Sequence, residues 1–224
     1  MALRKTDHAG VFTDGSWLYT RNLVPGVSVY GEGLSREGDA EYRRWDANRS
    51  KLAAYLKRGG RIWPFEATTS LLYLGAGSGT TVSHLSDICS RGSIMAIEVS
   101  PRSFRDLVTV AERRTNLLPL LGDASQPSTY RQHVEPVDVL YQDVAQRDQE
   151  GIFLKNVDFL RPGGTGFLIV KSRSTDVAAK PADVYARIER ALSDWGLQVI
   201  DVRTLDPFET DHAAVVVRKR NPHG

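Results

Sequence analysis

Strand-like and helix-like segments alternate from Ser70 almost to the end of the chain, and this alternation strongly constrains the fold. The predicted strands are SLLYLG, SIMAIEVS, LLPLLGD, VDVLYQDV and GTGFLIVKS, with helical stretches such as TTVSHLSDIC and PRSFRDLVTVAERR between them. This order predicts a mainly parallel, Rossmann-like α/β sheet covered by helices. The final strands LQVIDVRTL and HAAVVVRKR have no helix between them, which predicts a terminal antiparallel hairpin.

The N-terminal segment has a different pattern. Short strand-like pieces, GVFTDGSWLYTRNL and VSVYGEGL, are broken by Asp-Gly, Pro-Gly and Gly-Glu-Gly turn signals. We therefore predict a small β-rich domain over residues 1–45 and a Rossmann-like domain over residues 46–224. A helix over SKLAAYLKR is expected near the start of the second domain, with Asp46 or Asn48 as its N-cap.

Composition narrows the class of protein. The single cysteine, Cys89, excludes an intrachain disulfide and favours a cytoplasmic location. Neither CxxC nor HExxH occurs, so no metal site is predicted. We expect no signal peptide and no membrane partner, because no apolar run reaches about 18 residues. The net charge is +2, with eleven basic and seven acidic residues in residues 1–61, which favours an anionic partner there.

A glycine-rich loop follows the first predicted strand of the alternating region. Gly75, Gly77 and Gly79 lie between that strand and a helix, where glycine lets the backbone turn tightly and approach a ligand. The dinucleotide fingerprint G-x-G-x-x-G is incomplete because Thr80 occupies its last position. No lysine follows Gly79, so a phosphate-binding P-loop for ATP or GTP is disfavoured.

Acidic residues end the next two strands. Glu98 follows the glycine loop by about twenty residues, where a carboxylate can accept both hydroxyls of an adenosine ribose. Asp123 ends the third strand and could accept a hydrogen bond from an adenine amino group. Together with the terminal hairpin, these features favour S-adenosylmethionine over NAD and a class I methyltransferase fold. An NAD-dependent Rossmann reductase remains the alternative.

Six motifs together resemble the fibrillarin family over almost the whole chain: NRSKLAAYL, YLGAGSGTTVSHLSD, AIEVSPRSFRDL, LLGDAS, VDVLYQDVAQ and LIVKSRSTD. The chain lacks a glycine–arginine-rich N-terminal tail and resembles the shorter archaeal form. The resemblance implies S-adenosylmethionine-dependent 2′-O-methylation of ribose in rRNA and tRNA. It also implies a box C/D guide RNA, a target RNA, a Nop-family scaffold protein and a kink-turn-binding ribosomal-type protein as partners.

The resemblance also implies site residues. The catalytic set falls on Lys51, Asp143 and Lys171. The cofactor contacts fall on Gly75, Gly77, Gly79, Thr80, Thr81, Glu98, Val99, Asp123, Ala124, Asp143, Val144, Ala145 and Gln146.

Lys171 ends the fifth strand and is expected to lie closest to the ribose 2′-oxygen, as a base or as a stabilising cation. Asp143 would orient it and face the sulfonium. Because a fold does not determine its acceptor, methylation of a protein side chain is a second alternative.

Overall fold

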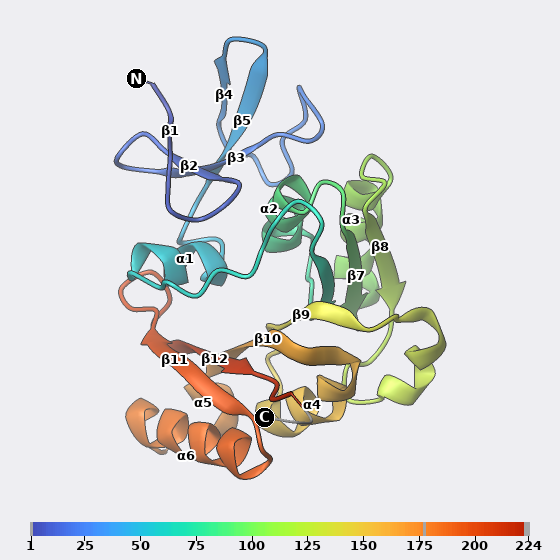
Figure 1. The fold of residues 1–224 in the computed structure, drawn as a ribbon, viewed down its shortest axis with the longest axis vertical. Helices are drawn as coiled ribbons and strands as arrows, with labels where there is room; N and C mark the ends of the chain where they lie inside the picture. Colours follow the sequence, from blue (N-terminus) through green and yellow to red (C-terminus); the bar gives the residue numbers. More distant parts are fainter. Residues whose placement is uncertain (1, 177, 222–224) are drawn as a thin grey trace.

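Two β-sheets organise the computed structural model, which describes residues 2–176 and 178–221 (Figure 1). The smaller sheet is antiparallel throughout, in the order β1-β2-β3-β5-β4. Its strands are β1 Arg4–Lys5, β2 Val11–Thr13, β3 Leu18–Arg21, β4 Leu34–Glu37 and β5 Ala40–Trp45. Strand β5 ends at Trp45, and the domain boundary expected between residues 45 and 46 stays a prediction.

The larger sheet confirms the predicted seven-stranded arrangement. Its order is β11-β12-β10-β9-β6-β7-β8. Strand β12 runs antiparallel to both β10 and β11, and the remaining neighbours are parallel. The strands are β6 Ser70–Leu74, β7 Ser93–Glu98, β8 Leu117–Leu121, β9 Val137–Gln142, β10 Leu160–Lys171, β11 Gln198–Thr204 and β12 His212–Arg218.

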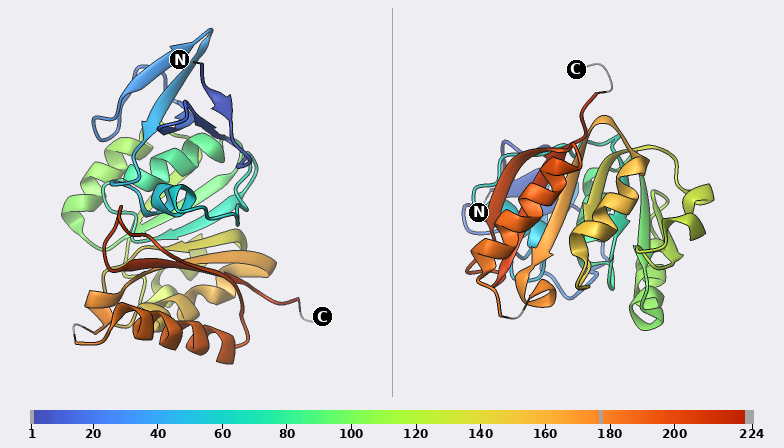
Figure 2. Two further views of the ribbon diagram at one scale, coloured as in Figure 1. Left: turned by 90° about the vertical axis from the view of Figure 1, so that its left-hand side faces the viewer. Right: turned by 90° about the horizontal axis from the view of Figure 1, so that it is seen from below.

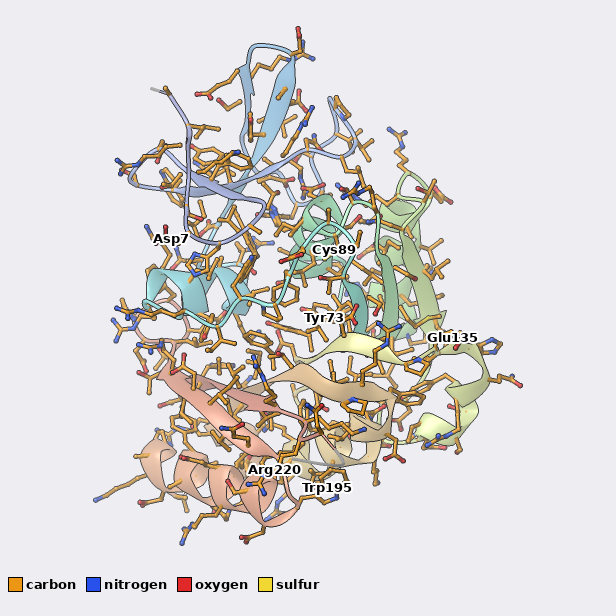
Figure 3. All side chains as sticks on the ribbon, in the orientation of Figure 1. Asp7, Tyr73, Cys89, Glu135, Trp195 and Arg220 are labelled. Carbon is orange, nitrogen blue, oxygen red and sulfur yellow. The ribbon has the colours of Figure 1, made fainter. Side chains whose placement is uncertain are left out.

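Helices cover both faces of this sheet (Figure 2). The helices are α1 Lys51–Lys57, α2 Thr80–Ile88, α3 Pro101–Ala111, α4 Gln149–Asn156, α5 Ser172–Thr175 and α6 Pro181–Asp194, with short 3₁₀ turns at Pro127–Thr129, Arg131–His133 and Val157–Phe159. Side chains alternate between the faces, so Tyr73 packs on the α1–α3 side and Leu72 on the α4 and α6 side. Tyr73 and Cys89 both lie in the interior (Figure 3). No helix in the described ranges is long and apolar enough to cross a bilayer.

The N-cap predicted for α1 was wrong. Ser50 caps the helix, and its hydroxyl accepts a hydrogen bond from the Ala53 amide at 3.4 Å. The Asp46 carboxylate instead accepts from the Asn48 amide in the preceding turn, at 2.9 Å. Both predicted residues belong to this turn, which leaves the capping position to the residue directly before Lys51.

A buried carboxylate joins the two sheets through α2. Asp87 accepts hydrogen bonds from the Thr20 hydroxyl at 2.7 Å and the Leu23 amide at 3.0 Å, both in the N-terminal part of the chain. It also pairs with Arg43 on β5 at 2.9 Å and with Arg114 after α3 at 2.7 Å. The side chains of these three charged residues are at most 1% exposed. Asp87 therefore holds the small sheet against α2 and α3 by direct charge pairing.

His84 is a neutral part of the same buried layer. The Thr20 hydroxyl donates its proton to Asp87, so it accepts from Nδ1 of His84 at 2.7 Å. Nε2 of His84 is then the acceptor for the Tyr30 hydroxyl at 2.8 Å. Burial, reinforced by the charge of Arg43, holds the pKa of His84 well below its usual value. His84 is thus a structural residue of the buried layer.

We expect Asp87→Asn to lower the free energy of unfolding by about 3–5 kcal/mol, because it leaves the buried Arg114 guanidinium without its counter-charge and Arg43 with Glu32 alone. Urea unfolding measures this change. The matched control is Asp106→Asn on the exposed side of α3, which should change stability by no more than about 0.5 kcal/mol. Equal stabilities for the two variants would contradict the role of Asp87.

The buried His84 should make stability depend on pH. Its folded pKa lies below the unfolded value of about 6.5, so the unfolded chain binds more protons and stability falls as the pH drops below about 6.5. In His84→Gln this dependence should weaken by up to about 1.4 kcal/mol per pH unit. Unfolding free energies measured from pH 7 down to pH 5 test the slope. The exposed control His133→Gln should retain the wild-type slope, and an unchanged slope in His84→Gln would refute the assignment.

Candidate functional site

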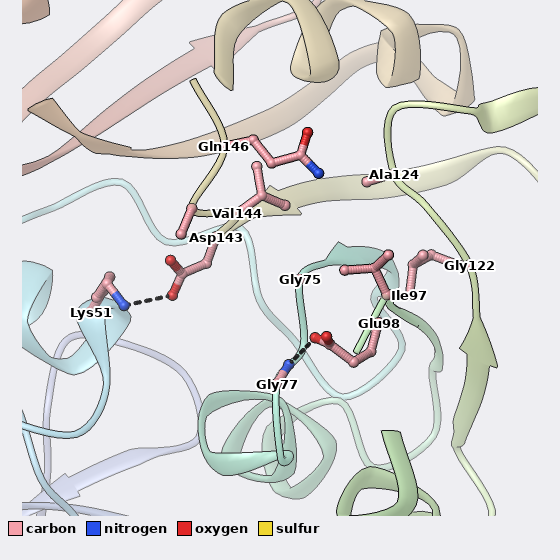
Figure 4. A pocket seen from close by; sticks show the side chains of 12 residues that line it. Lys51, Gly75, Gly77, Ile97, Glu98, Gly122, Ala124, Asp143, Val144 and Gln146 are labelled. Atoms are coloured by element: carbon pink, nitrogen blue, oxygen red, sulfur yellow. Dashed lines mark hydrogen bonds and ion pairs between the residues drawn. The ribbon is translucent and has the colours of Figure 1, made fainter. Parts of the chain in front are cut away.

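A pocket of about 450 Å³ lies at the carboxyl edge of the larger sheet (Figure 4). Parallel strands β6, β7, β8 and β9 all end there, which is where open α/β sheets bind ligands. The volume falls in the range of small-molecule sites, about 300–1,000 Å³. The pocket is lined by Lys51, Gly75, Gly77, Ile97, Glu98, Val99, Gly122, Ala124, Asp143, Val144, Ala145 and Gln146.

The glycine loop is held tightly between two neighbouring strands. The Gly75 and Ala76 amides donate to the Ile97 carbonyl at 2.9 and 3.1 Å. Gly75 has a φ of +78°, and a Cβ atom at this position would lie only 2.3 Å from the Asp143 carbonyl oxygen. The segment after β9 therefore packs directly on Gly75, and no larger residue fits there.

Glu98 presents a fixed carboxylate to the pocket. It ends β7, is 7% exposed, and accepts from the Gly77 amide at 2.7 Å and the Ser100 amide at 2.8 Å. Figure 4 shows the first of these bonds beneath the glycine loop. Each oxygen takes only one of these bonds, so the carboxylate retains acceptor capacity for ligand hydroxyls. Beside it, Val99 is 55% exposed and offers an apolar surface to the pocket.

Lys51 and Asp143 form an ion pair on the side of the pocket nearest α1. The Nζ atom of Lys51 lies 3.0 Å from Oδ2 of Asp143, and each side chain is 23% exposed (Figure 4). Burial disfavours the charged lysine, but the Asp143 carboxylate, aided by Glu209, outweighs it and raises the pKa of Lys51. Lys51 is therefore a cation at neutral pH.

Lys171 lies at the same sheet edge but does not line the pocket. It ends β10, its backbone amide donates to Oε1 of Gln149 at 2.8 Å, and its carbonyl accepts from Nε2 of Gln149 at 3.0 Å. Phe167 and Ile169 on the same strand pack on the α1 side, so strand alternation directs Lys171 to that side as well. Its side chain is exposed and can reach a substrate that lies over the sheet edge.

His212 joins this group through strand pairing. Its Cα lies opposite that of Lys171 in the β10–β12 ladder. Nδ1 of His212 donates to the Thr210 carbonyl at 2.7 Å, and Glu209 lies 4.0 Å away. Sequence reasoning did not select His212, because only the antiparallel pairing of β12 places it beside Lys171.

Some of the predicted cofactor residues line the pocket, and others lie outside its lining. Nine of the thirteen line the pocket, and Ile97 and Gly122 line it without having been predicted, each directly before a predicted acid. The other predicted residues lie outside the lining: Gly79, Thr80, Thr81 and Asp123. The Asp123 carboxylate accepts from the Ser125 amide at 2.8 Å, which lowers the pKa of Asp123.

This combination suits a nucleoside ligand that carries a positive charge. The Glu98 carboxylate can receive ribose hydroxyls, and Val99 and Ala124 offer apolar surface for a base. The Asp143 carboxylate can face a cationic group. Lys51 lines the pocket and Lys171 ends β10 at the same sheet edge, so both add positive charge on the side where an anionic substrate could approach.

Comparison with known proteins gives one consistent relationship. A family model described as Fibrillarin matches residues 3–221. The fibrillarin-like rRNA/tRNA 2′-O-methyltransferase of Thermococcus sibiricus is 45% identical over 226 residues, which cover 98% of this chain and 100% of that protein. More distant structures, such as a precorrin-6y C5,15-methyltransferase at 15% identity and a TM-score of 0.56, share the fold.

Two solved structures match nearly the whole chain. Aeropyrum pernix fibrillarin with natively bound S-adenosyl-L-methionine has a TM-score of 0.89 and 47% identity, covering 97% of this chain and 98% of that one. The fibrillarin of a fibrillarin/Nop5p complex has a TM-score of 0.89 and 36% identity, covering 97% and 100%. The fold is therefore that of S-adenosylmethionine-dependent methyltransferases, and the chain belongs to the fibrillarin family.

Proposed function

We propose that this protein transfers a methyl group from S-adenosylmethionine to ribose 2′-hydroxyls of rRNA and tRNA. The observation that carries the proposal is the pocket in which a glycine loop and Glu98 lie across from the Lys51–Asp143 pair. Family membership supports the same activity, since relatives are named fibrillarin-like rRNA/tRNA 2′-O-methyltransferase. The bound S-adenosyl-L-methionine of the Aeropyrum relative supports the choice of cofactor.

The residues of the pocket fit this cofactor. Glu98 would accept hydrogen bonds from the ribose hydroxyls, and the exposed Val99 side chain would offer apolar surface to the adenine. Gly79, Thr80 and Thr81 would contact the cofactor through their backbone groups at the start of α2. Asp123 would contact it from just outside the pocket lining. When bound, the cofactor supplies a methyl group on a positively charged sulfur, which departs as a neutral thioether.

The charged residues divide the remaining work. Lys51 is protonated, so it serves as the cation that holds Asp143 in place and not as a base. Asp143, which lines the pocket, would balance the positive charge of the sulfur. Lys171 would approach the ribose 2′-oxygen and stabilise the negative charge that develops on it as the hydroxyl proton passes to solvent water. Alignment of the two substrates supplies the largest part of the rate, up to about 7–11 kcal/mol of the barrier.

The nucleotide to be methylated would be selected by partners of this chain. We propose that a box C/D guide RNA pairs with the target RNA, and that a Nop-family scaffold and a kink-turn-binding ribosomal-type protein assemble the particle. The fibrillarin/Nop5p complex supports the scaffold. The net charge of only +2 supports a need for help in holding RNA, because proteins that bind RNA alone carry strong basic stripes. The buried thiol of Cys89 is compatible with a cytoplasmic particle.

We expect Glu98→Gln to weaken S-adenosylmethionine binding about 10- to 100-fold, because hydrogen bonds to a charged group contribute about 1.5–3 kcal/mol. Isothermal titration calorimetry on the purified chain measures the dissociation constant. Glu112→Gln, at an exposed position after α3, is the control and should bind normally. A change below twofold in Glu98→Gln would remove Glu98 from the site. Tight NAD binding in place of S-adenosylmethionine would identify a reductase.

We expect Lys171→Ala to lower the methylation rate about 10²–10³-fold while the cofactor dissociation constant stays within about twofold. The assay is methylation at the guide-selected nucleotide in a particle reconstituted with guide RNA and both partner proteins. Lys5→Ala, on the exposed strand β1, is the control for loss of a surface charge. A full rate in Lys171→Ala would exclude the lysine from the reaction, and methyl transfer to protein alone would identify a different acceptor.

A further inference from the structure

Lys51 reaches the pocket from the first position of a very short helix. Helix α1 has seven residues, Lys51–Lys57, and helices of this length are not stable by themselves in water. The position of Lys51 therefore depends on what anchors the start of α1. Apolar residues of α1 are buried against the core, and the anchor at its first turn is Ser50, which is 1% exposed and caps the helix through the Ala53 amide.

Ser50 is in turn held by the helix that follows the glycine loop. The Thr81 hydroxyl donates to Oγ of Ser50 at 2.9 Å, and Thr81 is 7% exposed. Thr81 is the second residue of α2, whose N-cap is Gly79. One buried hydrogen bond thus connects the end of the glycine loop to the residue that precedes Lys51.

The same buried layer also supports the partner of Lys51. The Tyr73 ring lies 4.6 Å, centroid to centroid, from the ring of Tyr141, two residues before Asp143. Burial raises the pKa of Tyr73 well above its usual value, and the neighbouring hydroxyls of Thr81 and Tyr141 oppose that rise. The Thr81 hydroxyl therefore contacts the residue that caps α1, and Tyr73 on β6 lies between Thr81 and Tyr141 on β9.

We propose that the Thr81 side chain is a positioning residue that acts through Ser50 to hold Lys51 against Asp143. The side chain is directed to Ser50, so it sets the geometry of the ion pair and not the affinity for cofactor. This inference rests on the proposed methyltransferase function. The Thr81–Ser50 hydrogen bond couples the position of Lys51 to that of the glycine loop, so the Lys51–Asp143 pair forms beside the cofactor pocket.

The kinetic test uses the reconstituted particle with Thr81→Val, Ser50→Ala, the double variant and the conservative Thr81→Ser. Each of the first two should lower kcat roughly 10- to 100-fold, because small misplacements of a reacting group are costly. The double variant should be no slower than the slower single variant. The cofactor dissociation constant should stay within twofold, and Thr81→Ser should restore the rate. Thr109→Val, on exposed α3, controls for the loss of a helical threonine hydroxyl.

Two kinetic outcomes would overturn the proposal. One is a rise in the cofactor dissociation constant of Thr81→Val that equals its loss in kcat, which would make the Thr81 side chain a cofactor contact. The other is full additivity of the Ser50→Ala and Thr81→Val effects, since residues that act through one bond are not additive.

A second readout does not need methylation. Hydrogen–deuterium exchange should accelerate at the amides of residues 51–57 in Thr81→Val but not in Thr81→Ser or Thr109→Val. Unchanged exchange there would refute the anchoring of α1 even in a particle with no detectable activity. An inactive wild-type particle with accelerated exchange in Thr81→Val would instead refute the proposed reaction and leave the anchoring intact.

Discussion

The buried carboxylate of Asp87 is the interaction on which the arrangement of the two sheets depends. It accepts from Thr20 and Leu23 and pairs with both Arg43 and Arg114, all away from solvent. These buried charges stabilise one another, and Glu32 adds a second carboxylate 2.6 Å from Arg43. The small sheet is consequently fixed to α2, the same helix whose first turn adjoins the pocket. The orientation of the N-terminal part thus depends on a charge network and not on apolar packing alone.

Close packing at the sheet edge shapes the pocket. Strands β6 and β9 are neighbours, and their following segments touch where Gly75 meets the Asp143 carbonyl. This contact brings the glycine loop and the aspartate of the ion pair together across a long stretch of sequence. On the other side, the backbone of the loop holds Glu98 through the Gly77 amide. Pocket-lining groups from three strands are therefore held in place by contacts with the backbone.

Much of this arrangement could be predicted from local patterns. The alternation of strands and helices predicted the seven-stranded sheet and its hairpin, because apolar periodicity directly reports which face of an element is buried. The cap of α1 could not be predicted in this way, since Asp46, Asn48 and Ser50 are all good N-cap residues and the contact with Thr81 distinguishes Ser50. The position of His212 could not be predicted either, because it lies beside Lys171 only through the register of β10 with β12.

The sequence by itself determined the fold class, the glycine loop, the acids at the strand ends and the resemblance to fibrillarin. These are properties of short segments, encoded by residue type and spacing. Only the tertiary structure decided that Lys51 pairs with Asp143 and that the Thr81 side chain contacts Ser50 instead of lining the pocket. Such contacts join residues 92 and 31 positions apart, so they depend on how the helices pack on the sheet. The spacing of residues along the chain does not predict that packing.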